Sequence, residues 1–267
     1  MMWRKMIRGL MGATDLILPR ICISCGEKLL IDEKHMCMHC LADMPRTFFW
    51  TARHNPMADR LNSLIQSELE SKAGQISSEW QREPYAYAVA LFHYDGTSGY
   101  SSITRELKYQ GNIGAGRYFS KMLGNRIRSC GWMNDIDLIV PVPLHSQRLR
   151  KRGYNQAEII ASEIATCLGV PMYGDFLVRT RKTASQATLE VEQKSANVSG
   201  AFQINPKAAS NAAETFARSG RRIRHILITD DVFTTGATAF ACFQALREHL
   251  PPDVRISIAT LGFVGRA

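Results

Sequence analysis

Two adjacent carboxylates, Asp230 and Asp231, follow a short apolar run over residues 226–228 that predicts a buried strand. A polar loop comes next, and then a helical pattern that Pro251 ends. A strand, loop and helix in this order direct backbone N–H groups toward a ligand, and the helix dipole adds positive potential. The loop residues are Thr234, Thr235, Gly236, Ala237 and Thr238. Glycine allows close approach of the backbone and threonine adds hydroxyl donors, so this loop suits a phosphate group.

The acidic pair suits a different part of the same ligand. Carboxylates are poor ligands for phosphate, but they accept hydrogen bonds from sugar hydroxyls, directly or through Mg²⁺. A sugar with a phosphate at one end and vicinal hydroxyls in the middle would satisfy both the loop and the acids.

Four cysteines form two C-x-x-C pairs with eleven residues between them. They are Cys22, Cys25, Cys37 and Cys40. Four thiolates complete a tetrahedral Zn²⁺ site and leave no open position, so we expect a structural zinc. Two redox pairs are the alternative, but no thioredoxin-like pattern surrounds them. Such a ribbon either touches nucleic acid or braces a neighbouring domain, and its mixed charge does not favour a nucleic-acid finger.

The chain carries a formal charge of +9. Four thiolates and one Zn²⁺ would lower this to about +7. A basic protein favours polyanions, either nucleic acid or a highly phosphorylated small molecule, and charge alone does not choose between them.

Cysteine usage and hydropathy predict a cytoplasmic protein. Three cysteines beyond the four are scattered rather than paired, which fits a reducing compartment. The sequence has no run of about 18 apolar residues, so we expect no transmembrane helix. Residues 1–20 read as an amphipathic helix that packs on its own protein, since Asp15 interrupts any signal-peptide core. A membrane-surface role for this helix is the minority alternative.

A second charged segment follows the strand expected at 137–143. We expect residues 144–153 to form a loop, with cations too numerous for a core: Arg148, Arg150, Lys151 and Arg152. Asn155 is a plausible N-cap for the next helix, which Gly169 closes.

The remaining pattern is coarser. Strands are expected at 85–94 and 255–261, and helices at 102–109 and 115–129. A short helix is expected at 60–69, and residues 206–219 read as a solvent-exposed insertion.

Residues 226–238 resemble the phosphoribosyl-pyrophosphate signature of type I phosphoribosyltransferases. Pro-Val-Pro-Leu-His at 141–145 and Arg-Gly-Tyr-Asn-Gln-Ala at 152–157 resemble the ComF family, which includes competence proteins of natural transformation and GntX-type proteins. The paired cysteines match that family's zinc ribbon, often called a double zinc ribbon. Leu107-Lys108-Tyr109 and the segment from 179 to 202 match as well, although Lys194 stands where the family usually has arginine.

The resemblance implies an α/β fold of the type I phosphoribosyltransferase kind, a Rossmann-like, mostly parallel sheet flanked by helices. It would span residues 85–267, after a zinc ribbon at 21–60 and a junction at 61–84. The acids would hold the ribose hydroxyls and the threonine loop the 5-phosphate. The pyrophosphate would meet Arg148, Arg152, Gly153 and Lys108. Residues 179–202 look like a flexible hood, from which Arg181 or Lys182 could reach the leaving group.

Two functional classes remain open. One is a Mg²⁺-dependent transferase that uses phosphoribosyl pyrophosphate and an unknown acceptor. The other is a non-catalytic competence factor that contacts single-stranded DNA or other competence proteins. The basic charge supports the second class, but the interleaving of aromatic and basic residues typical of a single-strand platform is absent outside Tyr85, Tyr87, Phe92 and Tyr94.

Overall fold

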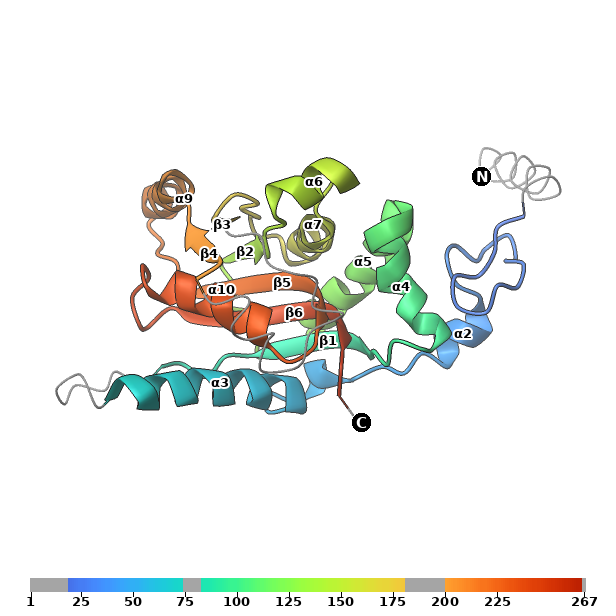
Figure 1. Ribbon diagram of the computed structural model, residues 1–267, viewed down its shortest axis with the longest axis horizontal. Helices are drawn as coiled ribbons and strands as arrows, with labels where there is room; N and C mark the ends of the chain where they lie inside the picture. The colour runs from blue at the N-terminus through green and yellow to red at the C-terminus, as the bar shows by residue number, and fades with distance from the viewer. Residues whose placement is uncertain (1–18, 74–82, 181–199, 266–267) are drawn as a thin grey trace.

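The computed structural model describes residues 19–73, 83–180 and 200–265 (Figure 1). The expected N-terminal helix therefore lies almost wholly outside the described residues. Arg181, Lys182 and Lys194 lie outside them as well.

A parallel sheet forms the centre of the molecule. Its strands are β1 (Ala88–His93), β2 (Leu138–Pro141), β5 (His225–Phe233) and β6 (Arg255–Phe263). Their order is β1-β6-β5-β2, and all three neighbouring pairs are parallel. The strands are near-continuous apolar runs because helices cover both faces of the sheet. The α/β class predicted from the sequence is confirmed, as are the strands at both ends of the domain.

Four helices form the outer layers (Figure 1). The pair α5 (Ile113–Ser129) and α7 (Gln156–Leu168) packs on one face, and α3 (Pro56–Ala73) and α10 (Ala237–Arg247) pack on the other. The expected helix at 60–69 is thus longer than its apolar pattern indicated, because α3 begins at a proline suited to a first turn.

The segment at 144–153 is not a loop, which corrects the sequence interpretation. Residues Ser146–Arg152 form the helix α6. His145 caps its N-terminus by accepting a hydrogen bond from the Gln147 N–H, and Gly153 ends it with φ +83°. Arginine, lysine, glutamine and leucine are good helix formers, so the cations lie on a short helix rather than on irregular backbone.

Residues 206–219 are not an exposed insertion either. Helix α9 (Pro206–Arg218) starts at the N-cap Asn205 and buries Ala208, Ala212 and Phe216 at a spacing of four residues. Alanine-rich sequence favours a helix, and this spacing gives it one apolar stripe.

Several smaller elements connect these layers. They are α2 (Met38–Ala42), the 3₁₀ turns η1 (Phe49–Thr51) and η2 (Gly99–Ser101), α4 (Ser102–Arg105), the π-helix η3 (Glu106–Gln110), and the antiparallel strands β3 (Leu177–Arg179) and β4 (Phe202–Ile204). The helix expected at 102–109 is therefore α4 continued by a π-helical turn, which Gly111 ends as expected.

Candidate functional site

A cavity of about 130 Å³ opens at the carboxyl ends of β2 and β5, where parallel α/β sheets bind ligands. Residues from six segments of the chain line it: Val142, Pro143, Leu144, Arg148, Gln156, Arg179, Asp230, Asp231 and Thr238. The structure thus brings the acidic pair, one residue of the threonine loop and one arginine of α6 to the same place.

The two acids point to opposite faces of the sheet. Strand β5 extends beyond its apolar start and runs through both of them, with Asp230 in register with Thr260 of β6. Because successive side chains along a strand point to opposite faces of the sheet, the side chains of Asp230 and Asp231 point in opposite directions. Thr229 and Asp231 face α7 and η3, where the Thr229 hydroxyl contacts the Ala157 carbonyl, while Asp230 faces α10.

Asp231 is held in an ion pair. Its Oδ2 atom lies 2.6 Å from Lys108 Nζ, and its side chain is 5% exposed. Burial opposes the charge on Lys108, but the Asp231 carboxylate outweighs it and raises the lysine pKa. The sequence interpretation placed Lys108 with the pyrophosphate, and the structure places it on the second acid.

The π-helix η3 explains how Lys108 reaches this position. Leu107 is buried, and a side-chain carbon on Gly116 would approach it within 2.6 Å. Tyr109 is 74% exposed and points to solvent. Lys108 lies between the inward direction of Leu107 and the outward direction of Tyr109, and it reaches Asp231. Single π-helical turns commonly occur at functional sites, where they redirect a side chain.

Asp230 lines the cavity, and its pKa is raised to about 7. Burial is the main cause, and the neighbouring Asp231 carboxylate adds to it. Near neutral pH this group therefore exists in both protonation states, whereas an ordinary aspartate is fully ionised.

The threonine loop has the predicted strand–loop–helix geometry. Gly236 adopts φ +88° at the N-cap of α10, and an added Cβ would lie 2.8 Å from Phe233 Cζ. The Thr235 hydroxyl accepts a hydrogen bond from the Ala237 N–H. Glycine is required at this position both by its backbone angle and by the space around it.

Helix α6 places two of the predicted anion ligands differently. Arg148 lines the cavity. Arg152 turns instead toward the Gln156 side chain and the ring of Tyr109, whose centroid lies 5.6 Å from the guanidinium carbon. Asn155 confirms its predicted N-cap role, since it accepts from the Ala157 N–H and donates to the Val142 carbonyl.

The predicted hood begins at a strand pair. Arg179, at the end of β3, lines the cavity and packs over the ring of Phe202 on β4. Burial, helped by the nearby Arg148, lowers the Arg179 pKa from its ordinary value.

Three residues near the site received no role from the sequence. Gln156 and Arg179 line the cavity, and Arg60 of α3 donates to the carbonyls of Thr234 and Val264 at 2.7 and 3.0 Å. Arg179 and Gln156 belong to the matched motifs, which was an available signal. Arg60 is 174 residues from Thr234, and no local pattern indicated that contact.

The four predicted cysteine ligands form one cluster, with all sulfurs within 4.8 Å of one another. Four sulfurs about 2.3 Å from one zinc ion would lie about 3.8 Å apart, so the cluster fits such an ion. The Cys37 N–H points at the Cys22 sulfur and the Cys40 N–H at the Cys37 sulfur, as in a metal knuckle. His35 and His39 are engaged elsewhere, with Tyr118 and Asp43.

The ribbon that carries the cysteines is braced against the sheet domain. Tyr100 donates to the Cys40 carbonyl, and the His93 N–H donates to the Pro45 carbonyl. A Cβ added to Gly99 would lie 2.2 Å from the backbone carbonyl oxygen of Ser24. The ribbon therefore packs directly against that glycine. These contacts favour the bracing alternative.

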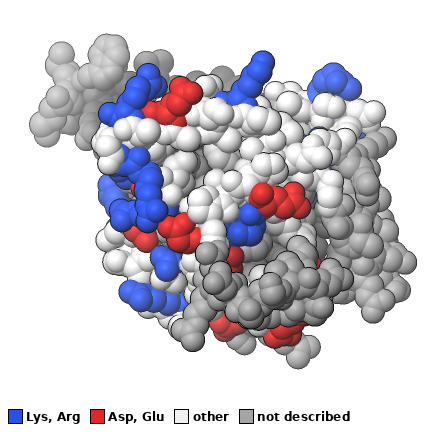
Figure 2. All heavy atoms as spheres, turned by 90° about the vertical axis from the view of Figure 1, so that its left-hand side faces the viewer, with Lys and Arg blue, Asp and Glu red and all other residues white. Residues whose placement is uncertain are grey.

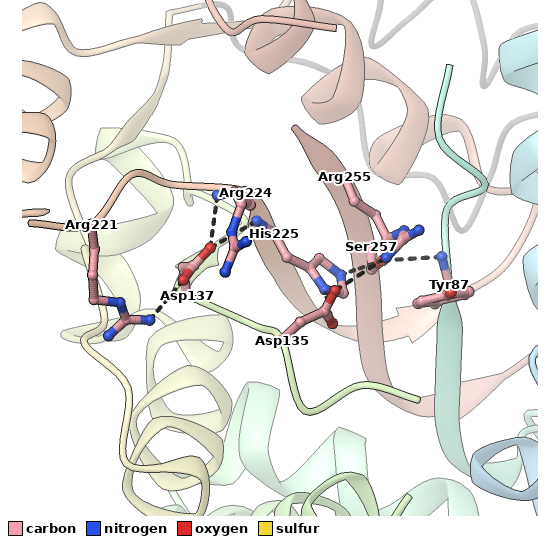
Figure 3. A network of polar contacts seen from close by, with 8 residues as sticks. All are labelled: Tyr87, Asp135, Asp137, Arg221, Arg224, His225, Arg255 and Ser257. Carbon is pink, nitrogen blue, oxygen red and sulfur yellow. Dashed lines mark hydrogen bonds and ion pairs between the residues drawn. The ribbon is translucent and has the colours of Figure 1, made fainter. Parts of the chain in front are cut away.

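A second polar network occupies the opposite, amino edge of the sheet (Figure 3). Asp137 accepts from Arg221 and from two backbone N–H groups. His225 lies between Asp135 and Ser257, 2.8 Å from each. The serine–histidine–aspartate order resembles a hydrolase triad, but Ser257 is fully buried and accepts from the Tyr87 N–H. This network is structural.

The fold and site define an α/β protein with a parallel sheet, a polar cavity at the carboxyl edge and a four-cysteine cluster. No family model matches the chain. The chain is 24% identical to competence protein F of Haemophilus influenzae over 88% of its length and 94% of that protein. It is 31% identical to the DNA utilization protein YhgH of Escherichia coli K12, across 45% of this chain and 47% of that protein.

Two solved structures are similar at low identity. Adenine phosphoribosyltransferase of Trypanosoma brucei matches at 13% identity with a TM-score of 0.33, over 61% of this chain and 68% of that one. The enzyme of Leishmania tarentolae matches at 15% with a TM-score of 0.30, over 61% and 74%.

The homologues confirm the resemblance to competence protein F that the motifs indicated. Among the described residues, no helix combines the length and the apolar character that crossing a membrane requires.

Proposed function

We propose that this protein binds phosphoribosyl pyrophosphate with Mg²⁺ at the carboxyl edge of the sheet and transfers the phosphoribosyl group to an acceptor. The observation that carries the proposal is the single cavity lined by Asp230, Asp231, Arg148, Arg179 and Thr238. Acids for ribose hydroxyls, arginines for pyrophosphate and Thr238 of the loop suited to a 5-phosphate all line it.

In this reaction the bond between ribose C1 and the pyrophosphate oxygen breaks, and pyrophosphate leaves with the bonding electrons. The acceptor donates an electron pair to C1 and loses a proton. Positioning and electrostatics supply most of such catalysis. Arg148 and Arg179 would stabilise the departing charge, and Asp230 would accept from a ribose hydroxyl.

The cavity fits Mg²⁺ because this ion is usually held by one or two carboxylates together with ligand phosphates. Asp230 and Asp231 both line the cavity, and because Lys108 holds Asp231, Asp230 would be the acid to contribute. Bound there, Mg²⁺ would neutralise part of the pyrophosphate charge. Zn²⁺ at the cysteines would keep the ribbon folded and take no part in the reaction.

Calorimetry tests the ligand. The zinc-loaded wild type should bind phosphoribosyl pyrophosphate at micromolar concentration only with Mg²⁺, and Asp230→Asn/Asp231→Asn should not bind. The single variant Asp230→Asn keeps the ion pair between Lys108 and Asp231. Loss of binding in this variant therefore cannot be caused by loss of that ion pair. Absence of binding by the folded wild type would overturn the proposal.

The phosphate loop has a matched pair of variants. Gly236→Ala forces a Cβ against Phe233, whereas Gly131→Ala places one in open space. We expect the first to weaken binding at least about tenfold, because the backbone N–H groups shift, and the second to leave it unchanged. Equal binding by both variants would show that the loop is not the phosphate site.

A role in DNA utilization is the second candidate, favoured by the homology to competence protein F over 88% of the chain. In this role the protein acts on single-stranded DNA or on competence proteins. Expression of the chain in Haemophilus influenzae lacking competence protein F should restore transformation. If the Asp230→Asn variant also restores transformation, the result favours the non-catalytic role. If the wild-type chain does not restore it, the result counts against a shared function of this protein and competence protein F.

A further inference from the structure

Helix α3 contacts the start of the threonine loop, although it lies far from that loop in the sequence. Arg60 Nη1 lies 2.7 Å from the Thr234 carbonyl oxygen and 3.0 Å from that of Val264, the residues directly after β5 and β6. The Val264 N–H also donates to the Phe233 carbonyl at 2.8 Å. The guanidinium carbon of Arg60 lies 5.3 Å from the centre of the Phe263 ring. One side chain of α3 thus holds both strand ends where the loop begins.

The contact with Thr234 sets the direction of the next backbone N–H group. A trans peptide is planar, so its carbonyl and its N–H point in opposite directions. Because the Thr234 carbonyl points to Arg60, the Thr235 N–H points away from Arg60. A hydrogen bond from a charged guanidinium is stronger than a neutral one, which favours this orientation of the peptide. Backbone N–H groups are what a loop before a helix offers to a phosphate, so Arg60 fixes the orientation of one such group.

A second side chain of α3 supports the glycine of the loop. Leu64 lies one helical turn after Arg60, so both side chains are on the same face of α3. A Cβ added to Gly236 would lie 3.0 Å from Leu64 Cδ1, which places Leu64 against this glycine. The positive φ of Gly236 is the conformation from which α10 starts. Arg60 and Leu64 therefore contact two backbone positions on which the shape of the loop depends.

Helix α3 is itself fixed to the outermost strand of the sheet. Asn62 donates to the Ala86 carbonyl at 2.8 Å and accepts from the Ala86 N–H at 3.0 Å, just before β1. Asn55 accepts from the Ala58 N–H in the first turn of α3 and donates to the Ala88 carbonyl at 3.0 Å. Strand β1 is at one end of the sheet order, so these asparagines use its unpaired edge. A side chain on such a fixed helix can hold a loop precisely.

The partners of Arg60 differ from those of an arginine at the amino edge. Figure 2 shows the amino edge, where Lys and Arg side chains lie beside Asp and Glu. Arg222 pairs there with Asp253 at 3.2 Å. Arg60 donates to carbonyls instead, and it forms no ion pair within the described parts of the chain. Its charge therefore adds to the positive potential near the loop.

We propose that α3 positions the threonine loop for a phosphate group, through Arg60 and Leu64, and thereby sets the affinity for the sugar-phosphate end of the ligand. This inference rests on the proposed function, because it concerns the same ligand. Both residues are positioning residues, since they act through the loop. They come from segments expected to form the zinc ribbon, 21–60, and the junction, 61–84, so these segments would contribute to the site.

Calorimetry with two half-ligands, on the full zinc-loaded chain, tests the inference. Ribose 5-phosphate probes the loop, and pyrophosphate with Mg²⁺ probes Arg148 and Arg179, which lie on other elements. Arg60→Met keeps a long side chain without a donor, and should weaken ribose 5-phosphate binding at least about tenfold while pyrophosphate binds as in the wild type. Arg60→Lys restores a charged donor and should recover part of the loss. Leu64→Ala should weaken ribose 5-phosphate binding by a smaller factor.

The matched control is Arg222→Met, which removes an exposed arginine at the amino edge and should bind both half-ligands as the wild type does. Urea unfolding checks that each variant is folded, and Leu64→Ala carries the test if Arg60→Met is not. The proposal is overturned if these two variants bind ribose 5-phosphate as tightly as the wild type. It is also overturned if they lose both half-ligands to the same degree, which is the result expected for a purely structural role.

The whole ligand separates this inference from the proposed function. If the folded wild type does not bind phosphoribosyl pyrophosphate, the proposed function fails and the inference fails with it. If the wild type binds it and Arg60→Met binds it equally well, only the inference fails.

Discussion

The two edges of the sheet each carry two nearby aspartates and several basic residues, yet they are built for different purposes. At the amino edge Asp137 accepts three hydrogen bonds, and Asp135 pairs with both His225 and Arg255. At the carboxyl edge both acids line a cavity, and among the described residues Asp231 pairs with Lys108 whereas Asp230 forms no ion pair.

The two edges differ in how completely their aspartates are supplied with hydrogen-bond and ion-pair partners. A closed network stabilises the strand starts, whereas an incompletely paired carboxylate in a cavity costs stability and is available to a ligand. The pKa shifts agree with this, because the hydrogen bond from His225 lowers the pKa of Asp135 while burial raises that of Asp230.

The largest expected effect is at the closed edge. Asp137→Ala leaves two backbone N–H groups and Arg221 without their acceptor, and should lower the free energy of unfolding by about 3 kcal/mol. Urea unfolding measures this. Asp253→Ala breaks only the exposed pair with Arg222 and should cost at most about 1 kcal/mol. Similar values for the two variants would show that the amino edge is not the stabilising one.

A smaller loss is expected for the paired acid of the open edge. Asp231→Asn leaves Lys108 without its charge partner and should cost about 2 kcal/mol. A double-mutant cycle with Lys108→Met measures the coupling. The control cycle uses Arg117 and Glu163, a pair with an arginine that is 63% exposed, and should give less than about 1 kcal/mol. Equal coupling in both cycles would contradict the distinction.

The remaining expected effect has the opposite sign. The folded pKa of Asp230, about 7, lies above the ordinary 3.8, so ionisation disfavours the folded state as pH rises through this range. Asp230→Asn removes this cost and should stabilise the protein at pH 8. The gain should shrink from pH 7 to pH 5.

The control for this pH dependence is Glu214→Gln, which changes an exposed acid on α9. Binding of the proposed ligand should strengthen as pH rises through 7, because the ribose hydroxyls and Mg²⁺ need the ionised carboxylate. Binding that weakens with rising pH would mean that Asp230 acts in its protonated form.

Local sequence sufficed where the physics is local. The glycine turn before α10, the cap Asn155 and the paired cysteines are fixed by neighbouring residues, and each was predicted correctly. The loop expected at 144–153 and the insertion expected at 206–219 were wrong. The sequence interpretation did not recognise His145 and Asn205 as helix caps, and the alanine stripe of α9 becomes buried only in the folded protein.

The sequence by itself determined the parallel α/β class, the order of the motifs and the chemical kinds of group available. Only the tertiary structure decided how those groups are divided. The adjacency of Asp230 and Asp231 indicated one shared role, but β5 runs through both and turns them to opposite faces. Lys108, 123 residues from Asp231 along the chain, then neutralises one acid and leaves the other to the cavity. Contacts between such distant residues depend on packing, which no local pattern encodes.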